Sequence, residues 1–253
     1  MYTKSKTVEK ALEIIEYIVG KNSPTGIHEI AKSININTST VQRIINTLNS
    51  TKYLCQDPES KKYSLGLKFL EISKVILDEM DVWKIAHTYL KELRDTTQET
   101  IHLMILDHYM GVYIDSLESP QMSRVASAIG TRADLHYSAV GKAILAHLPD
   151  DEVEKVVKTI GLKKMTQNTI TDFKELKKEL LEIRNRGYSI DNEEGEIGTC
   201  CIGVPILKHN GKVIASISLA APSHRLTKKK VEEYMPLIVE TAKKISADLG
   251  YIK

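Results

Sequence analysis

Cysteine is scarce in this chain of 253 residues, which contains only Cys55, Cys200 and Cys201. Three thiols cannot build a disulfide framework, and an odd number favours a reducing compartment. Cys200 and Cys201 are adjacent, so on a strand their side chains point to opposite faces and cannot bind one zinc ion together. The sequence also lacks any Cys-x-x-Cys or His-x-x-x-His spacing. We therefore expect neither a metal site nor a cofactor.

Long apolar runs are missing as well. No segment approaches the roughly 20 apolar residues that a membrane-spanning helix needs. The first residues, Met-Tyr-Thr-Lys-Ser-Lys, lead into a charged amphipathic segment without the apolar stretch of a secretory signal. The composition is otherwise ordinary for a globular protein, with 42% hydrophobic and 27% charged residues. These features predict a soluble, cytoplasmic protein with no membrane partner.

Acidic residues are absent from one stretch near the N-terminus. Residues 30–56 contain no Asp or Glu, although 33 of the 253 residues in the chain are acidic. Around this stretch, residues 1–66 carry nine Lys and Arg against six Asp and Glu, a net charge of +3. The stretch itself is rich in Asn, Ser and Thr, whose short side chains form hydrogen bonds. Such a composition is typical of a surface that meets phosphates and base edges.

Hydrophobic periodicity divides this basic part into three helices and a hairpin. In the first helix, Val8, Leu12, Ile15 and Ile18 recur on one face, which we expect to be buried. The next expected elements are helices over 27–34 and 38–50 and strands over 53–56 and 62–65. Three helices followed by a hairpin form a winged helix-turn-helix, which we assign to residues 1–66.

The third expected helix carries the candidate DNA contacts. Its apolar residues take one face, and its first two turns present polar side chains on the other. A recognition helix places such residues in the major groove, where Gln and Asn bond adenine, Arg bonds guanine, and Ser and Thr mainly hold phosphate. Two lysines at the tip of the hairpin would reach the neighbouring backbone. The predicted contacts are Thr38, Ser39, Thr40, Gln42, Arg43, Asn46, Lys61 and Lys62.

Two points of this interpretation stay open. Ser39 and Gln42 have the spacing of a capping box, and Asn37 is a second candidate cap for the same helix. The polar face could also be the solvated side of an ordinary three-helix core. The acid-free stretch and the hairpin favour DNA binding over that alternative.

A charged amphipathic helix is expected to join this domain to the rest of the chain. Its pattern covers residues 67–79, and we assign 67–81 to a linker helix. The apolar stripe of this helix consists of Leu67, Leu70, Val75 and Ile76. Such a stripe must pack on something, and in a dimer the partner chain is the natural candidate.

The remaining residues, 82–253, are assigned to a second domain. Helices mix there with strand pairs, which is typical of an α+β domain with a largely antiparallel sheet. The expected strands are 100–106, 111–117, 124–128, 187–192, 199–207 and 212–220. The expected helices are 82–96, 139–147, 151–159, 172–186 and 228–249.

Two neighbouring strands of this domain predict a ligand pocket. On 199–207 one face carries Thr, Cys, Gly and Pro, and on 212–220 one face carries mostly Ser and Ala. A sheet face of small residues leaves volume for a ligand, or lets a helix pack closely on it, and both interpretations stay open. Ser138 is expected to cap the helix 139–147, whose free N–H groups favour an anion.

Three weaker interpretations concern titratable side chains. Cys201, His136 and Asp191 could form a nucleophilic trio, but nothing in their spacing compels it. The acidic residues of 191–194 are expected to be solvated. His102 and His136 are expected to be local hydrogen-bonding partners rather than ligands.

The whole chain resembles the IclR family of bacterial transcriptional regulators. The motifs that carry the resemblance are Val8-Glu-Lys-Ala-Leu-Glu-Ile-Ile, Ile27-His-Glu-Ile-Ala, Ser39-Thr-Val-Gln-Arg-Ile-Ile, Leu135-His-Tyr-Ser-Ala-Val-Gly-Lys-Ala-Ile-Leu-Ala, Arg184-Asn-Arg-Gly-Tyr-Ser-Ile-Asp-Asn-Glu-Glu, Ile202-Gly-Val-Pro-Ile and Ser218-Leu-Ala-Ala-Pro. The resemblance implies a winged-helix domain, a linker helix and a GAF-like effector domain. It also implies homodimers or homotetramers that act on palindromic operators.

Family members sense small organic acids or aromatic compounds in the effector domain. By matching motif, the resemblance implies effector contacts at the backbone of Ala139 and Val140 and at Asp191, Cys201, Ser218 and Ala220, with an apolar wall of Met122, Val125 and Ala133. Members that bind short oxoacids tend to have Ser where Ala220 stands here. The missing hydroxyl argues against a glyoxylate- or pyruvate-like effector.

The sequence is thus interpreted as a DNA-binding transcriptional regulator, expected to be a repressor, whose operator binding a small organic acid controls. No enzymatic activity is expected. The alternatives are a DNA-binding protein without an effector and an enzyme built on a GAF-like fold. No motif encodes the identity of the effector, the operator sequence or the sign of regulation.

Overall fold

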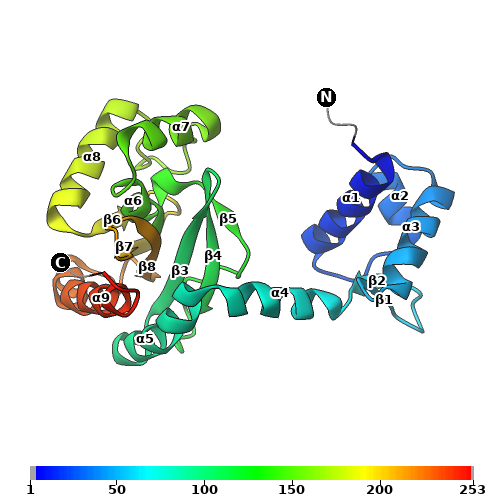
Figure 1. Cartoon of the computed structure of the whole chain (residues 1–253), viewed down its shortest axis with the longest axis horizontal. Helices are drawn as coiled ribbons and strands as arrows, with labels where there is room; N and C mark the ends of the chain where they lie inside the picture. Colours follow the sequence, from blue (N-terminus) through cyan, green and yellow to red (C-terminus); the bar gives the residue numbers. More distant parts are fainter. Residues whose placement is uncertain (1–3, 252–253) are drawn as a thin grey trace. The chain divides into compact units, whose positions relative to one another are not determined.

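The structure is a computed structural model that describes residues 4–251 (Figure 1). The chain divides between Glu79 and Met80 into two compact units. Within residues 4–251, no helix is long and apolar enough to cross a membrane.

The first unit is a three-helix domain with a hairpin. Its elements are α1 Lys6–Lys21, α2 Ile27–Ser33, α3 Thr38–Ser50, β1 Leu54–Gln56, β2 Tyr63–Leu65 and α4 Lys68–Glu79. The two strands are antiparallel. Ile14, Ile30 and Ile45, one from each of the first three helices, are fully buried in one core. The prediction of a winged helix-turn-helix is confirmed in the type and order of its elements.

The structure corrects the expected packing of α1. Ile14 and Ile18 are buried, whereas Val8 and Leu12 are 57% and 54% exposed. The other helices of the unit cover only one side of α1, so a stripe as wide as the sequence pattern cannot be buried within the unit. The apolar stripe of α4 is uncovered as well, because no residue of that helix is buried.

The start of α3 also differs from expectation. Asn37 occupies the N-cap position but makes no side-chain hydrogen bond to the helix. The Gln42 amide donates to Asn46 Oδ1 at 2.9 Å instead of reaching back toward Ser39. The capping box does not form because the helix begins at Thr38, which places Ser39 inside the first turn.

The second unit is an antiparallel sheet between two layers of helices (Figure 1). Its strands are β3 Thr100–Asp107, β4 Met110–Leu117, β5 Arg132–Ala133, β6 Ser189–Asn192, β7 Thr199–Leu207 and β8 Val213–Pro222, in the spatial order β5-β4-β3-β8-β7-β6. The helical elements on one face are α5 Asp81–Thr97 and α9 Lys228–Asp248; those on the other are η1 Leu135–Tyr137, α6 Ala139–Leu145, α7 Asp150–Ile160 and α8 Phe173–Arg186. The predicted α+β fold is confirmed.

One expected strand is absent. Residues 124–128 are irregular, and the short strand that pairs with β4 is β5, farther along the chain. Side chains hold the irregular segment in place of a ladder: Thr100 Oγ1 donates to the Val125 carbonyl and Arg225 Nη1 to the Ser123 carbonyl, both at 2.7 Å. These hydrogen bonds satisfy the Val125 and Ser123 carbonyls without a neighbouring strand.

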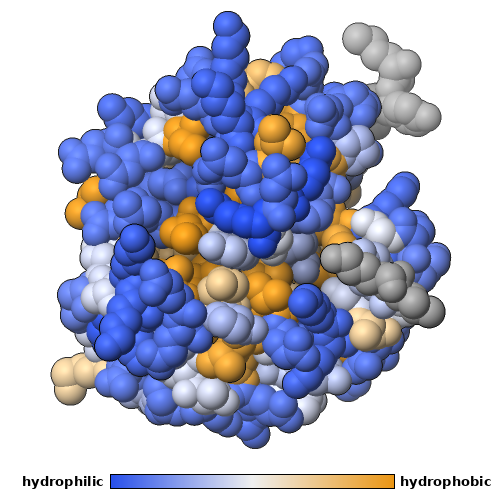
Figure 2. Space-filling view, turned by 90° about the vertical axis from the view of Figure 1, so that its left-hand side faces the viewer, coloured by the Kyte–Doolittle hydropathy of each residue, from blue (hydrophilic) through white to orange (hydrophobic). Residues whose placement is uncertain are grey.

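A shallow apolar groove lies between α8, α9 and β7. Its lining includes Val204, Leu207, Val239 and Ala242. Figure 2 views the second unit from its α8 and α9 side and shows apolar surface at the centre of a largely hydrophilic face.

Candidate functional site

The polar face of α3 is the first candidate site. Of the predicted contacts on this helix, four are exposed and two are half-buried: Thr38, Ser39, Arg43 and Asn46, and Thr40 and Gln42. The buried side of the helix holds it against the core of the unit. Since α3 carries no acidic residue, nothing on the helix itself repels a polyanion.

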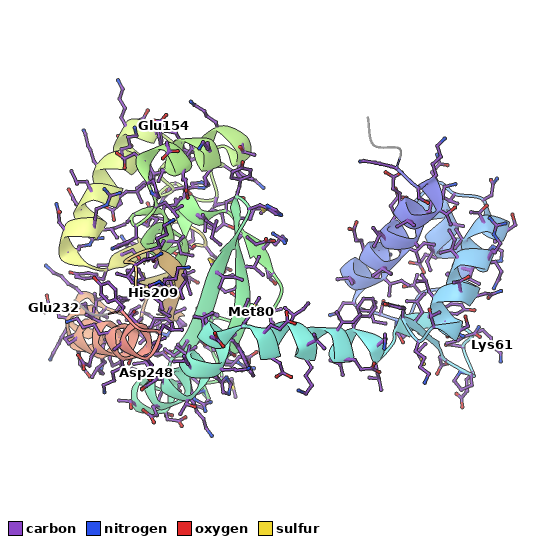
Figure 3. The ribbon with its side chains drawn as sticks, in the orientation of Figure 1. Lys61, Met80, Glu154, His209, Glu232 and Asp248 are labelled. Carbon is purple, nitrogen blue, oxygen red and sulfur yellow. The ribbon has the colours of Figure 1, made fainter. Side chains whose placement is uncertain are left out.

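The hairpin places two lysines beside each other at its tip. Asp57 closes the turn between β1 and β2, because its Oδ1 accepts hydrogen bonds from the amide and hydroxyl of Ser60, both at 2.7 Å. The Lys61 carbonyl accepts from Gln56 Nε2. Lys61 and Lys62 are both exposed, and Figure 3 shows Lys61 at the outer end of the hairpin. The arrangement leaves two ammonium groups available to a phosphate backbone; their contact with DNA stays a prediction.

The second candidate site is a cavity of about 240 Å³ in the second unit. Its floor is the sheet face opposite α5 and α9, where residues of neighbouring strands lie side by side. The register aligns Asp191, Cys201, Ala220 and Thr100 in one row and Gly203, Ser218, His102 and Ser116 in the next. The volume suits a small organic molecule.

Helix α6 closes one end of this face. Ser189 Oγ donates to the Ala139 carbonyl and Ser216 Oγ to the Val140 carbonyl, both at 2.6 Å. A Cβ atom at Gly203 would lie 2.4 Å from the Ala139 carbonyl oxygen, so only glycine fits there. The small residues therefore serve both roles that the sequence allows: they pack under α6 at one end and leave a cavity at the other.

Eight of the nine predicted effector contacts line the cavity: Val125, Ala133, Ala139, Val140, Asp191, Cys201, Ser218 and Ala220. Met122 does not, because its side chain is 98% exposed. Thr100 Oγ1 binds both the Ser119 amide and the Val125 carbonyl, so the residues between these two anchors bulge into solvent. The expected apolar wall at Met122 is wrong. That the other eight contact an effector stays a prediction.

Several residues that line the cavity were not among the predicted contacts. His102 and Tyr113 come from the floor. Strand alternation along β3 could have identified His102, because His102 pairs in register with Ser218 and lies on the same face of the sheet. The others, largely from irregular segments or strand ends that carry no period, are Ser127, Thr131, Arg132, Tyr137, Ser138, Met165, Gly195, Glu196 and Thr199.

His102 and His136 are equally buried but differ in their partners. Each is 3% exposed. His136 Nε2 lies 2.9 Å from the Lys163 carbonyl oxygen, which confirms the expected local hydrogen bond. His102 Nε2 has no hydrogen-bond partner among the described residues, so the same expectation is wrong there. Its ring lies 5.2 Å from that of Tyr113, and burial lowers the pKa of His102 to about 4, which keeps the imidazole neutral at pH 7.

Two of the three acidic residues of 191–194, Asp191 at the end of β6 and Glu194 after it, are buried, contrary to expectation, whereas Glu193 is half-buried. Lys142 Nζ donates to Glu194 Oε1 at 2.5 Å and to the Ile190 carbonyl at 2.8 Å. Asp191 Oδ1 accepts from the Glu194 amide at 2.7 Å, and burial raises the pKa of Asp191 to about 7. Because Lys142 is 1% exposed on α6, its ammonium group needs a counter-ion in the interior, and the loop supplies it.

The candidate nucleophilic trio is not assembled. Burial raises the pKa of Cys201 well above its ordinary value, so the thiol stays protonated at pH 7. His136 does not line the cavity, and its Nε2 faces the Lys163 carbonyl. Across residues 4–251, no group of three His, Cys, Asp or Glu side chains is placed to hold a metal ion.

Two family models together match most of the chain. Residues 7–58 match the IclR helix-turn-helix domain, and residues 74–247 match the bacterial transcriptional regulator IclR C-terminal domain. The HTH-type transcriptional regulator KdgR of Escherichia coli strain K12 is 37% identical over 245 residues, which cover 97% of this chain and 93% of KdgR.

Solved structures have the same fold. The crystal structure of Thermotoga maritima IclR gives a TM-score of 0.85 at 38% identity and covers 97% of this chain and 99% of that one. An IclR homologue from Microbacterium hydrocarbonoxydans, complexed with 4-hydroxybenzoate, gives 0.84 at 21% identity and covers 96% of this chain and 99% of that one. At the lower identity, the likeness concerns the fold alone.

Proposed function

Because this chain belongs to the IclR family of bacterial transcriptional regulators, we propose that it binds a palindromic operator through residues 1–66 and a small organic acid through residues 82–253. It is a DNA-binding regulator with an effector-binding C-terminal domain, not an enzyme. In this proposal residues 67–81 link the two domains, and binding of the acid releases the operator. The protein then acts as a repressor in the cytoplasm, where the chromosome lies.

The observation that carries the DNA-binding role is the exposed, acid-free face of α3 beside the two lysines of the hairpin. Arg43 and Asn46 lie on the exposed side of α3 and Gln42 is half-buried, and these are the residue types that read base edges in a major groove. Lys61 and Lys62 carry charge without base information, as phosphate contacts do.

Replacing Arg43 by alanine is expected to weaken operator binding by about 1–3 kcal/mol and to relax the base preference at one position of each half-site, because a bidentate contact to guanine is lost. Lys62→Ala should weaken binding to all sequences alike. The measurement is fluorescence anisotropy with an operator selected from genomic DNA and with its single-base variants. Lys164→Ala, at an exposed lysine of the second unit, is the charge-matched control. Unchanged binding in Arg43→Ala would contradict the assignment of α3.

The uncovered stripe of α4 supports a homodimer or homotetramer. Leu67, in the turn just before α4, is 76% exposed, and on the helix Leu70 is 66%, Val75 58% and Ile76 49% exposed. Apolar surface gathered on one helix marks an interface, and a second copy of the chain is the partner that matches the two half-sites of a palindrome.

The cavity supports an acidic effector. Ala139 and Val140 line it at the start of α6, and their backbone N–H groups have no acceptor within residues 4–251. The next amide, of Gly141, is already satisfied by Ser138 Oγ at 3.1 Å, as the sequence predicts. Together with the hydroxyl of Ser218 on the floor, the two free amides suit a carboxylate. A hydrocarbon would leave these donors unpaired.

Carboxylic acids are therefore expected to raise the melting temperature of the protein more than the amides of the same acids do. Two matched pairs test this: 4-hydroxybenzoate with 4-hydroxybenzamide, and D-gluconate with D-gluconamide. Ser218→Ala should weaken acid binding by about 1.5–3 kcal/mol, because a hydrogen bond to a charged group is lost. Stabilisation by the amides but not by the acids would refute the anion pocket while leaving the regulator assignment intact. No stabilisation by any metabolite pool would favour the alternative without an effector.

A further inference from the structure

Polar side chains without partners meet at one level of the sheet. In the register of β4, β3 and β8, His102 is opposite Ser116 on one side and Ser218 on the other. His102 Nε2 and Ser116 Oγ are buried and make no hydrogen bond with the residues that the structure describes. His102 and Ser218 also line the cavity.

Three other hydroxyl groups of the sheet make hydrogen bonds within the fold. Thr100 Oγ1 donates to the Val125 carbonyl, and the hydroxyls of Ser189 and Ser216 donate to carbonyls of α6. Asp191 Oδ1 accepts from the amide of Glu194. Packing accounts for each of these groups but not for His102. A buried polar atom without a partner lowers stability, so the imidazole is suited to a group that the free protein does not contain.

The neutral imidazole restricts what that group can be. One ring nitrogen donates and the other accepts. Ser116 lies opposite His102 across the β3–β4 register. Its hydroxyl group is unpaired in the free protein, and cross-strand neighbours are close enough for it to rotate and accept from the protonated nitrogen when a ligand takes the other one. The second nitrogen then remains as an acceptor for a ligand. A carboxylate has no proton to donate to it, whereas a hydroxyl group has.

We propose that His102 is a specificity-determining residue that accepts a hydrogen bond from a hydroxyl group of the effector, and that the effector is a hydroxylated carboxylic acid. The inference rests on the proposed function, in which the cavity binds the effector. It adds the residue that distinguishes hydroxylated acids from their deoxy analogues. The carboxylate lies toward the amides of Ala139 and Val140, and the hydroxyl group lies over β3.

The first test needs no ligand. His102→Phe removes both ring nitrogens and keeps an aromatic ring against Tyr113, so the free full-length protein is expected to melt at or above the wild-type temperature. His136→Phe is the matched control at the same exposure. It loses the hydrogen bond to Lys163, and its melting temperature should fall by about 2–4 °C. Equal losses in both variants would make His102 structural and overturn the proposal. His102→Leu, with a smaller side chain, repeats the test if phenylalanine is too large.

The second test uses two pairs of acids that differ only in their hydroxyl groups, 4-hydroxybenzoate with benzoate and D-gluconate with hexanoate. Isothermal calorimetry on the full chain should show that wild type prefers the hydroxylated member of at least one pair. His102→Phe is expected to lose about tenfold or more of that preference, while His102→Asn, which keeps an acceptor, retains most of it.

The possible results distinguish failure of the proposed role of His102 from failure of the proposed acidic effector. Acids that bind wild type without a preference for hydroxyl groups, or a preference that survives in His102→Phe, overturn the role of His102 alone. Failure of all four acids to bind overturns the acidic effector of this cavity, and the role of His102 with it.

Discussion

Replacing Lys142 by alanine is expected to lower the free energy of unfolding by about 3–5 kcal/mol. Lys142 Nζ lies 2.5 Å from Glu194 Oε1 and 3.9 Å from Glu179 Oε1, and the lysine side chain is 1% exposed. Without the ammonium group, Glu194 remains in the interior with no counter-ion. Burial raises the pKa of Glu194 even when Lys142, which lowers it, is present. Urea unfolding followed by the fluorescence of Trp83, the single tryptophan of the chain, reports on the second unit.

Control variants and the pH dependence of stability test whether the loss comes from the buried Lys142–Glu194 pair. Lys155→Ala breaks the exposed pair with Asp151 and should leave stability nearly unchanged. Lys142→Met combined with Glu194→Gln removes both charges and should recover much of the loss. In Lys142→Ala, stability should fall as pH rises through the pKa of Glu194, because a raised pKa means that the folded protein holds the proton more tightly than the unfolded chain does. A Lys142→Ala protein as stable as wild type would contradict a desolvated pair.

A rise in salt from 50 to 200 mM is expected to weaken operator binding by about 10²–10⁴-fold. A dimer with about two to four cations on each copy neutralises about 4–8 phosphates, and the counterions that it releases set the slope of log K against log salt. Lys61 and Lys62 are exposed and are the proposed phosphate contacts, two cations on each copy.

Anisotropy titrations at five salt concentrations measure this slope. Lys62→Ala should reduce its magnitude by about two for a dimer, because each copy loses one phosphate contact. Lys164→Ala should leave it unchanged. A flat salt dependence in wild type would contradict the proposed interface.

Much of the fold could be predicted because, in many segments, the local pattern alone determines the local structure. The helix Thr38–Ser50 and the strand Thr199–Leu207 have the predicted bounds. In each, apolar residues recur with the period of one element, and that period does not depend on what packs against it. The floor of the cavity could be predicted from the sequence for the same reason, since strand alternation places Cys201 and Ser218 on one face.

The features that the sequence did not reveal depend on residues far apart in the chain. Lys142 and Glu194 are separated by 52 positions, so no periodic pattern connects the acidic loop with its counter-ion. Arg225 holds the Ser123 carbonyl across 102 positions, and an irregular segment replaces the expected strand. The exposure of Met122 and the unpaired ring of His102 likewise depend on which distant segments pack against them, and the sequence of a single helix or strand does not encode those contacts.

The anchoring of α6 bears on how regulators of this kind diverge. At the closed end of the floor, a side chain on Gly203 would collide with the Ala139 carbonyl, and Ser216 is bonded to Val140, so a mutation there disturbs the helix along with whatever it binds. Ala220 lies in the open row, where one nucleotide change to serine adds a hydroxyl group and leaves α6 in place. A change in ligand preference is therefore expected to be tolerated more readily at Ala220 than at Gly203 or Ser216.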